Sequence, residues 1–157
     1  MSNAAILALE DGSVFSGRAF GARTVRTGEV VFNTSLTGYQ EVFTDPSYTG
    51  QIVILTNPQI GNYGTSAGDN EAARAFIEGL VVREWAEQPS NWRSEESADQ
   101  FLARQSIPVI SEIDTRAIVR RLRSQGVMRG ALSTAGHTAA ELVEMARNSP
   151  LMSGRDL

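Results

Sequence analysis

The chain has 157 residues, a formal net charge of −4, no Cys, one His at position 137, and only Arg among its 14 basic residues. This length fits one domain with a sizeable core, and 41% hydrophobic with 20% charged residues is typical of a soluble globular chain. The missing Cys excludes disulfides, thiolate zinc sites and a cysteine nucleophile, and the missing Lys excludes Schiff-base chemistry and a Walker phosphate lysine. The chain is therefore poorly equipped to be a complete enzyme.

The first 70 residues hold nine of the 14 glycines, and they predict short strands joined by turns. Asp11-Gly12 predicts a two-residue hairpin turn with a positive φ at both positions. The run Ile52–Leu55 has no polar alternation, so we expect it to be buried on both faces. The strands predicted up to residue 83 are Ala5–Glu10, Ser13–Phe20, Glu29–Asn33, Ile52–Leu55 and Gly79–Arg83.

The second half predicts helices with strands between them. Ser94, Asp114 and Thr138 are suitable N-caps, and Thr138 with Glu141 forms a capping box. The three predicted helices end near Arg104, at Gly126 and before Pro150. Strands are expected at Val109-Ile110, after Pro108, and over Val127–Ser133.

These elements predict a single α/β domain whose mixed sheet is antiparallel early in the chain and crossover-connected later. The apolar run Ala5–Leu9 is too short for a signal peptide or a membrane span, so we expect a cytoplasmic protein without a membrane partner. The 18 acidic residues outnumber the 14 basic ones, which argues against a nucleic-acid partner.

The stretch Phe32–Tyr48 is rich in hydroxyl and amide side chains and follows a predicted buried strand. Within it, Thr44-Asp45-Pro46-Ser47 predicts a turn that leaves the hydroxyl and the amide of Ser47 free to bind a small polar ligand. The alternative is a pair of self-satisfied Asx and Ser/Thr turns, and composition alone favours that alternative.

A second candidate is the Gly-rich loop over residues 57–70, which is long for a compact domain. Its glycines allow close backbone approach to a ligand or to another chain, although no phosphate-loop pattern is present. A plain surface connection explains the loop equally well.

The predicted helix after Asp114 carries Arg116, Arg120 and Arg123 at spacings of four and three residues, which form one charged stripe. A solvated helix face is the usual explanation, and docking onto an acidic partner is the alternative.

Two other kinds of catalytic site find little support. His137 could serve a serine triad, but no Gly-x-Ser-x-Gly elbow supplies a serine, so we expect a surface loop residue. The carboxylates of Glu29, Glu41 and Asp45 have no spacing that supports an acid pair.

Taken together, six motifs in order closely resemble the N-terminal domain of the small, glutamine-hydrolysing subunit of carbamoyl phosphate synthetase. The resemblance runs from about Leu7 to Leu157, and each motif alone is modest. The motifs are Leu9–Gly12, Gly28–Ser35, Thr37–Glu41, Thr44–Tyr48, Ile60–Gly64 and Ile113–Arg116.

The resemblance implies a three-layer β/β/α swivelling domain over residues 1–157. It also implies a parent ligase that hydrolyses glutamine and passes ammonia to a large synthetase subunit. That subunit makes carbamoyl phosphate from bicarbonate and ATP for arginine and pyrimidine biosynthesis, and it would hold the ATP and Mg²⁺. In the family, a C-terminal class I amidotransferase domain with a Cys–His–Glu triad hydrolyses glutamine. Nothing in this chain aligns with that domain, so the resemblance implies a non-catalytic domain without a cofactor or metal of its own.

One ligand residue carries over by position. The serine of the family's Thr-Asp-Pro-Ser-Tyr motif helps to bind glutamine across the domain boundary, and it corresponds to Ser47. The resemblance therefore reverses the preference drawn from composition for that turn. Gly61, Asn62 and Arg116 match family patterns without an assigned role. The alternative is a free-standing binding or scaffold module that reuses the fold, and a glutaminase domain in frame after Leu157 would argue against it.

Overall fold

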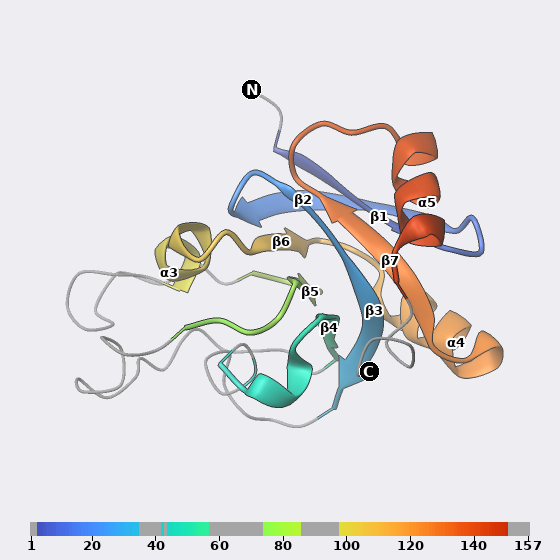
Figure 1. The fold of residues 1–157 in the computed structure, drawn as a ribbon, viewed down its shortest axis with the longest axis horizontal. Helices are drawn as coiled ribbons and strands as arrows, with labels where there is room; N and C mark the ends of the chain where they lie inside the picture. The colour runs from blue at the N-terminus through green and yellow to red at the C-terminus, as the bar shows by residue number, and fades with distance from the viewer. Residues whose placement is uncertain (1–2, 35–41, 43, 57–73, 86–97, 151–157) are drawn as a thin grey trace.

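The computed structural model describes residues 3–34, 42, 44–56, 74–85 and 98–150. In this part of the chain, strands form one sheet that closes into a barrel in the order β1-β2-β6-β5-β4-β3-β7 (Figure 1). The strands are β1 (Ala4–Leu9), β2 (Val14–Gly21), β3 (Val25–Asn33), β4 (Gln51–Leu55), β5 (Gly79–Val82), β6 (Pro108–Ser111) and β7 (Met128–Ser133). The helical elements are the 3-10 turn η1 (Pro46–Tyr48) and the helices α3 (Ala98–Arg104), α4 (Thr115–Gln125) and α5 (Ala139–Asn148).

The sheet has a parallel part and an antiparallel part. Strands β3, β4, β5 and β6 are parallel neighbours. Antiparallel pairs join β1 to β2, β1 to β7, β2 to β6 and β3 to β7. The prediction of a single α/β domain with a mixed sheet is confirmed. One feature differs from the expected layers: each of the seven strands pairs with two neighbours, so the hydrogen bonding closes on itself.

The turn between β1 and β2 differs from the predicted two-residue hairpin. Leu9 pairs with Ser13 across the turn, because the Leu9 amide donates to the Ser13 carbonyl at 2.8 Å, and the Gly12 amide donates back to the Leu9 carbonyl at 2.9 Å. Only Gly12 has a positive φ, of 97°, so the prediction that Asp11 also has one was wrong. The reason is loop length: a three-residue connection uses an ordinary turn followed by one left-handed residue.

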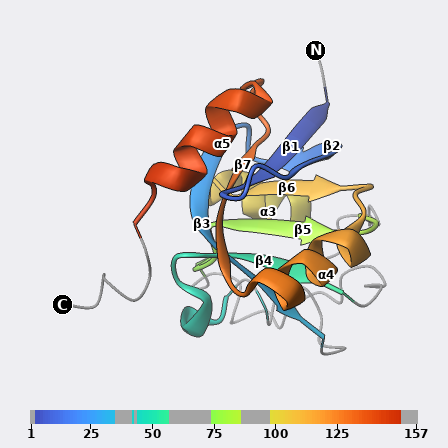
Figure 2. The same cartoon turned by 90° about the vertical axis from the view of Figure 1, so that its right-hand side faces the viewer.

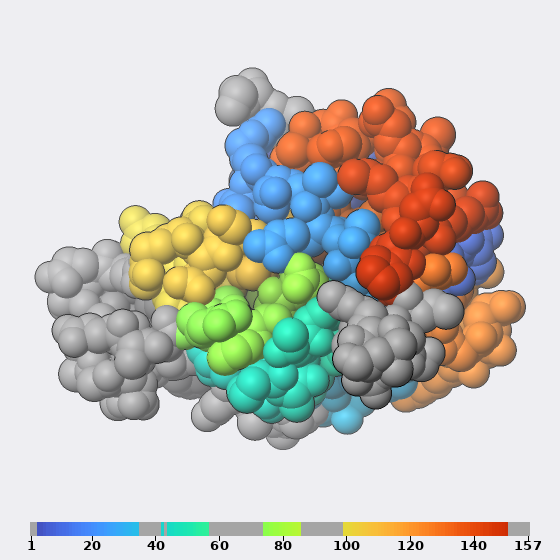
Figure 3. All heavy atoms as spheres, viewed as in Figure 1, coloured from blue at the N-terminus to red at the C-terminus, as the bar shows by residue number. Residues whose placement is uncertain are grey.

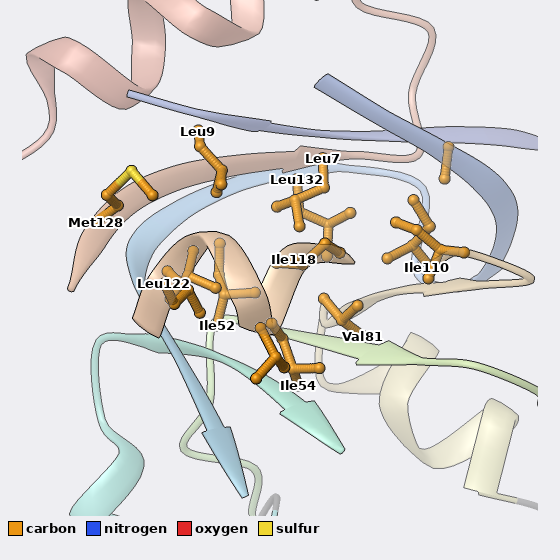
Figure 4. Packing of buried hydrophobic residues seen from close by; sticks show 14 residues of the cluster. Leu7, Leu9, Ile52, Ile54, Val81, Ile110, Ile118, Leu122, Met128 and Leu132 are labelled. Atoms are coloured by element: carbon orange, nitrogen blue, oxygen red, sulfur yellow. The ribbon is translucent and has the colours of Figure 1, made fainter. Parts of the chain in front are cut away.

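The barrel interior holds the first core cluster, and α4 packs against it (Figure 4). Ile52 and Ile54 of β4 lie in this cluster together with Ile118 and Leu122 of α4. Val53 and Leu55 alternate to the other face and lie in a second cluster, so β4 is buried on both faces, as predicted. Full burial of such an aliphatic side chain contributes about 1.5–3 kcal/mol, and α4 is therefore an integral part of the core.

Two helices cover the outside of the barrel. Helix α3 places Phe101 and Leu102 in the second cluster, against Leu80 of β5 and Val109 of β6. Helix α5 packs Leu142 and Ala146 on Ala8 of β1 and Ala131 of β7. Figures 1 and 2 show α5 lying across the β1–β7 side of the barrel. No helix in the described ranges is long and apolar enough to cross a membrane.

The predicted helix ends at Asp114, Gly126 and Thr138 are confirmed. The Asp114 carboxylate accepts the Ala117 amide at 3.0 Å, and Gly126 ends α4 with a φ of 88°. At α5, Thr138 and Glu141 form both hydrogen bonds of the capping box. The hydrogen bond from the Thr138 amide helps to hold the pKa of Glu141 below its ordinary value. The predicted cap at Ser94 lies outside the described residues.

Most strand ends differ from the prediction by one residue, and the start of β3 differs by four. Strand β3 begins at Val25 instead of Glu29, because its early residues pair with β7. Strand β7 begins at Met128, and Val127 is 63% exposed between α4 and the sheet.

Candidate functional site

The turn that carries Ser47 connects β3 to β4. Asp45 has the extended backbone expected before Pro46, and its Oδ1 accepts the Ser47 amide at 2.9 Å. The Thr49 hydroxyl and amide both donate to the Pro46 carbonyl, at 2.7 and 3.1 Å. Gly50 then has a φ of 82°, which favours glycine, and leads the chain into β4. Asp45 and Thr49 therefore fix a single turn of 3-10 helix at this position.

The buried Val42 and the partly buried Tyr48 anchor this turn to the barrel. Val42 is 2% exposed within the second core cluster, and Tyr48 packs against the same cluster. The Tyr48 hydroxyl also accepts a hydrogen bond from the Asn33 side chain at 2.6 Å, which ties η1 to the end of β3. Ser47 itself is exposed between these anchors, and the segment lies at the molecular surface in Figure 3. A rigid support therefore presents an exposed serine.

We predicted that the hydroxyl and the amide of Ser47 are both free to bind a ligand, and the prediction for the amide was wrong. The amide is not free, because it donates to Asp45 Oδ1 in an Asx turn. Within the described residues, the Ser47 hydroxyl makes no hydrogen bond, so it can donate to or accept from a ligand. The structure thus combines the two alternatives: Asp45 satisfies the backbone of the turn, and only the hydroxyl of Ser47 faces outward.

His137 has a partner that the sequence did not predict. Its Nδ1 lies 2.7 Å from Oγ of Ser133, which also accepts the Ala135 amide at 3.0 Å. Ser133 is 2% exposed, so a substrate has no access to this pair. His137 lies in the loop after β7, as predicted, and it is half-buried there. A serine four residues before a histidine is the sequence signal that could have indicated this contact.

Two of the carboxylates considered for an acid pair, Glu29 and Asp45, have structural hydrogen-bond partners. Glu29 accepts a hydrogen bond from the Gln51 side chain at 3.4 Å, and Asp45 holds the η1 turn. Glu41 lies outside the described residues, as does the predicted loop over residues 57–70 with Gly61 and Asn62. In the part of the chain that the structure describes, no three His, Asp or Glu residues cluster as metal ligands would.

The predicted arginine stripe lies along α4. Arg116, Arg120 and Arg123 are all exposed, and they line one hollow beside the barrel. Arg83, which directly follows β5, lines the same hollow, although no sequence pattern groups it with the helix. The signal that could have found it is topological, because residues that follow parallel strands meet at one edge of a sheet.

The amino-acid sequence of the chain matches a known protein family. Residues 7–132 match the family profile described as carbamoyl-phosphate synthase small chain, CPSase domain. The chain belongs to this family. The small chain of Syntrophotalea carbinolica is 53% identical over 153 residues, and that of Akkermansia muciniphila is 55% identical over 150 residues. The chloroplastic small chain of Oryza sativa subsp. japonica is 52% identical over 143 residues.

These small chains are much longer than this chain. The matches cover 98%, 96% and 90% of this chain, but only 41%, 40% and 32% of the three relatives. Among solved structures, the aminopeptidase from Aneurinibacillus sp. strain AM-1 covers 82% of this chain and 30% of its own, with 16% identity and a TM-score of 0.46. A likeness at that level carries no functional argument.

The motifs that resemble the small-chain family can now be placed in the fold. Leu9–Gly12 is the turn between β1 and β2, and Gly28 to Asn33 lies within β3. Thr44–Tyr48 forms the η1 turn, and Ile113–Arg116 begins α4 at its Asp114 cap. The described motifs of this small-chain domain therefore lie largely at turns and helix starts, where particular side chains satisfy the backbone.

Proposed function

We propose that this chain is the N-terminal, non-catalytic domain of the small subunit of a glutamine-hydrolysing carbamoyl phosphate synthetase. In this proposal, Ser47 contributes its hydroxyl to a glutamine site that a separate class I glutaminase domain completes. The ammonia then passes to a large synthetase subunit, which holds ATP and Mg²⁺ and makes carbamoyl phosphate. The match to about two fifths of the small chains leaves room for such a second domain.

The observation that carries the proposal is the rigid presentation of Ser47. A residue that helps to bind a substrate across a domain boundary must be exposed and held in place, because a mobile donor loses conformational entropy on binding. Asp45 holds the Ser47 amide, and Val42 and Tyr48 anchor the turn on the second core cluster. A neutral hydroxyl also suits a zwitterionic amino acid amide, which it can bind through donation or acceptance.

The absence of Cys supports the non-catalytic assignment. A class I glutaminase forms an acyl-enzyme on a thiolate, and this chain has no thiol. The Ser133–His137 pair does not replace it, because Ser133 is 2% exposed. The chain therefore supplies binding and support in this proposal, and the chemistry belongs to another domain.

The test compares glutamine-dependent with ammonia-dependent carbamoyl phosphate synthesis in the assembled two-subunit enzyme that carries Ser47→Ala. We expect KM for glutamine to rise roughly 2–13-fold, since one neutral hydrogen bond contributes about 0.5–1.5 kcal/mol. Ammonia-dependent synthesis should stay unchanged, because ammonia bypasses the glutamine site. Ser124→Ala is the matched control, since Ser124 is exposed near the end of α4. Equal loss of both activities in Ser47→Ala would instead assign Ser47 a structural role.

A further inference from the structure

The carboxyl ends of four parallel strands meet at one end of the barrel. Thr34, Thr56 and Arg83 are the first residues after β3, β4 and β5, and the chain after β6 leads directly into α4. Figure 2 shows the arrowheads of β5 and β6 pointing to the side on which α4 begins. Small ligands bind preferentially at the carboxyl ends of parallel strands in α/β sheets, which makes this end a candidate binding place.

Two adjoining hollows lie at this end, between the strand ends and α4. One has a volume of about 210 Å³ and includes Thr34 and Thr56 in its lining. The other has a volume of about 380 Å³ and includes Asp114. Both hollows share Arg83, Arg116 and Arg120, together with the buried Thr115. The combined space is large enough for a small anionic molecule.

The charge of these hollows is strongly positive. Arg123 completes the group and lies over the Phe32 ring, with its guanidinium carbon 5.2 Å from the ring centre. Among the described residues, no carboxylate forms an ion pair with Arg83, Arg116 or Arg120. Asp114 is the carboxylate in the lining, and its Oδ1 already accepts the Ala117 amide as the cap of α4.

Several other arginines of the chain form ion pairs with carboxylates. Arg121 lies next to Arg120 on α4, but its guanidinium reaches Asp11 at 3.4 Å. Arg26 and Arg129 likewise pair with Glu78 and Glu10. Arg83, Arg116 and Arg120 differ from these three arginines, because they surround a hollow without a carboxylate partner in the described ranges. Guanidinium charges that line one hollow repel one another, and an anion between them relieves that repulsion.

We propose that these hollows form a binding site for a small phosphate-class oxyanion. A guanidinium offers a planar fork of donors that matches phosphate oxygens. The concave shape and the position at the strand ends favour a free small molecule over the flat acidic surface of a protein. The site is independent of Ser47, which precedes β4, whereas Thr56 follows it.

The test is a calorimetric titration of the chain with inorganic phosphate and with pyrophosphate at low ionic strength. Arg120→Gln removes one guanidinium shared by both hollows, from an exposed position that should not affect folding. We expect this variant to bind pyrophosphate roughly 10–100-fold more weakly, as for the loss of a charge-assisted contact. Arg121→Gln is the matched control, with the same change of charge on the same helix, and its affinity should stay within about twofold of the parent chain.

Amide chemical shifts provide a second measurement that also detects weak binding. Phosphate should shift the amide signals of Thr34, Thr56 and Thr115 with one common binding curve, while those of α5 stay unchanged. The proposal fails if neither phosphate nor pyrophosphate binds at millimolar concentration, or if both arginine variants weaken binding equally. It also fails if the parent chain binds no phosphate but Arg120→Gln weakens assembly with a large subunit, because a partner's carboxylate would then be the occupant.

Discussion

Asp45 and Ser47 act as one unit in the proposed glutamine site, because Asp45 Oδ1 accepts the Ser47 amide at 2.9 Å. Asp45→Ala removes this acceptor and frees the turn, so we expect KM for glutamine to rise roughly 2–13-fold, as for one lost hydrogen bond. Asp45→Asn keeps an oxygen at the same place and should preserve most of the glutamine affinity. Ammonia-dependent synthesis should be unchanged in both variants. If Asn is as harmful as Ala in steady-state assays, the charge of Asp45 matters and the turn geometry does not.

At the residue scale, the sequence predicted the contacts of the Asp45 turn but missed those of His137 and Arg83. The turn at Asp45 and Pro46 follows from the chemistry of those two residues, and the structure confirms it. The contact of His137 with Ser133 was missed, because it depends on how the loop after β7 folds back. Arg83 was missed for a different reason: it approaches α4 only through the strand order of the sheet.

At the scale of elements, one ion pair joins three parts of the fold. Arg129 of β7 donates through Nε to Glu10 Oε1 at 3.0 Å and through Nη2 to Glu10 Oε2 at 3.1 Å, just after β1. Its Nη1 also donates to the Ser149 carbonyl at the end of α5, at 2.7 Å. The hydrogen bonds from the Arg129 side chain hold the pKa of Glu10 below its ordinary value, although partial burial opposes them. This Glu10–Arg129–Ser149 junction therefore links the end of α5 to the paired strands β1 and β7.

Glu10→Gln should lower the free energy of unfolding at pH 7 by about 1–3 kcal/mol, because it removes a charged, two-point contact. The pKa of Glu10 is lowered in the folded state, so its contribution is fully present above the ordinary pKa of about 4.3 and is lost as the pH falls through the folded value. Urea unfolding at pH 7 and at pH 2–3 measures this difference, which should shrink at the lower pH.

The matched control for this change is Glu112→Gln. Glu112 pairs with Arg18 at 3.5 Å, but the two side chains are 59% and 52% exposed. Solvent screens such a pair, so its loss should have little effect at either pH. A Glu10→Gln variant as stable as the Glu112→Gln variant at pH 7 would contradict the role given to the junction.

Helix ends were the most predictable elements. The caps at Asp114, Gly126 and Thr138 depend on residues within one turn, and all three occur as expected. Closure of the barrel was not predictable in the same way. It requires β1 to pair with β7, more than 110 residues later, and no local pattern specifies that partner. The early start of β3 has the same cause, since Val25 pairs with Ser133.

For the whole molecule, the closed barrel supports the two proposed binding regions at separate places. The η1 turn with Ser47 precedes β4, and the arginine-lined hollows lie where β4 and its parallel neighbours end. The core between them includes Ile52 and Ile54 of β4 and Ile118 of α4, all fully buried. A close-packed interior of this kind holds both regions in fixed positions.

The central claim is that this domain supports glutamine binding and that another domain carries out the hydrolysis. The most direct test measures the release of ammonia from glutamine by the purified 157-residue chain, with the complete small subunit as the positive control. We predict no release above the buffer blank at any chain concentration, because the chain has no thiol to form an acyl-enzyme and buries Ser133. Ammonia release that increases in proportion to the concentration of the chain would contradict this claim.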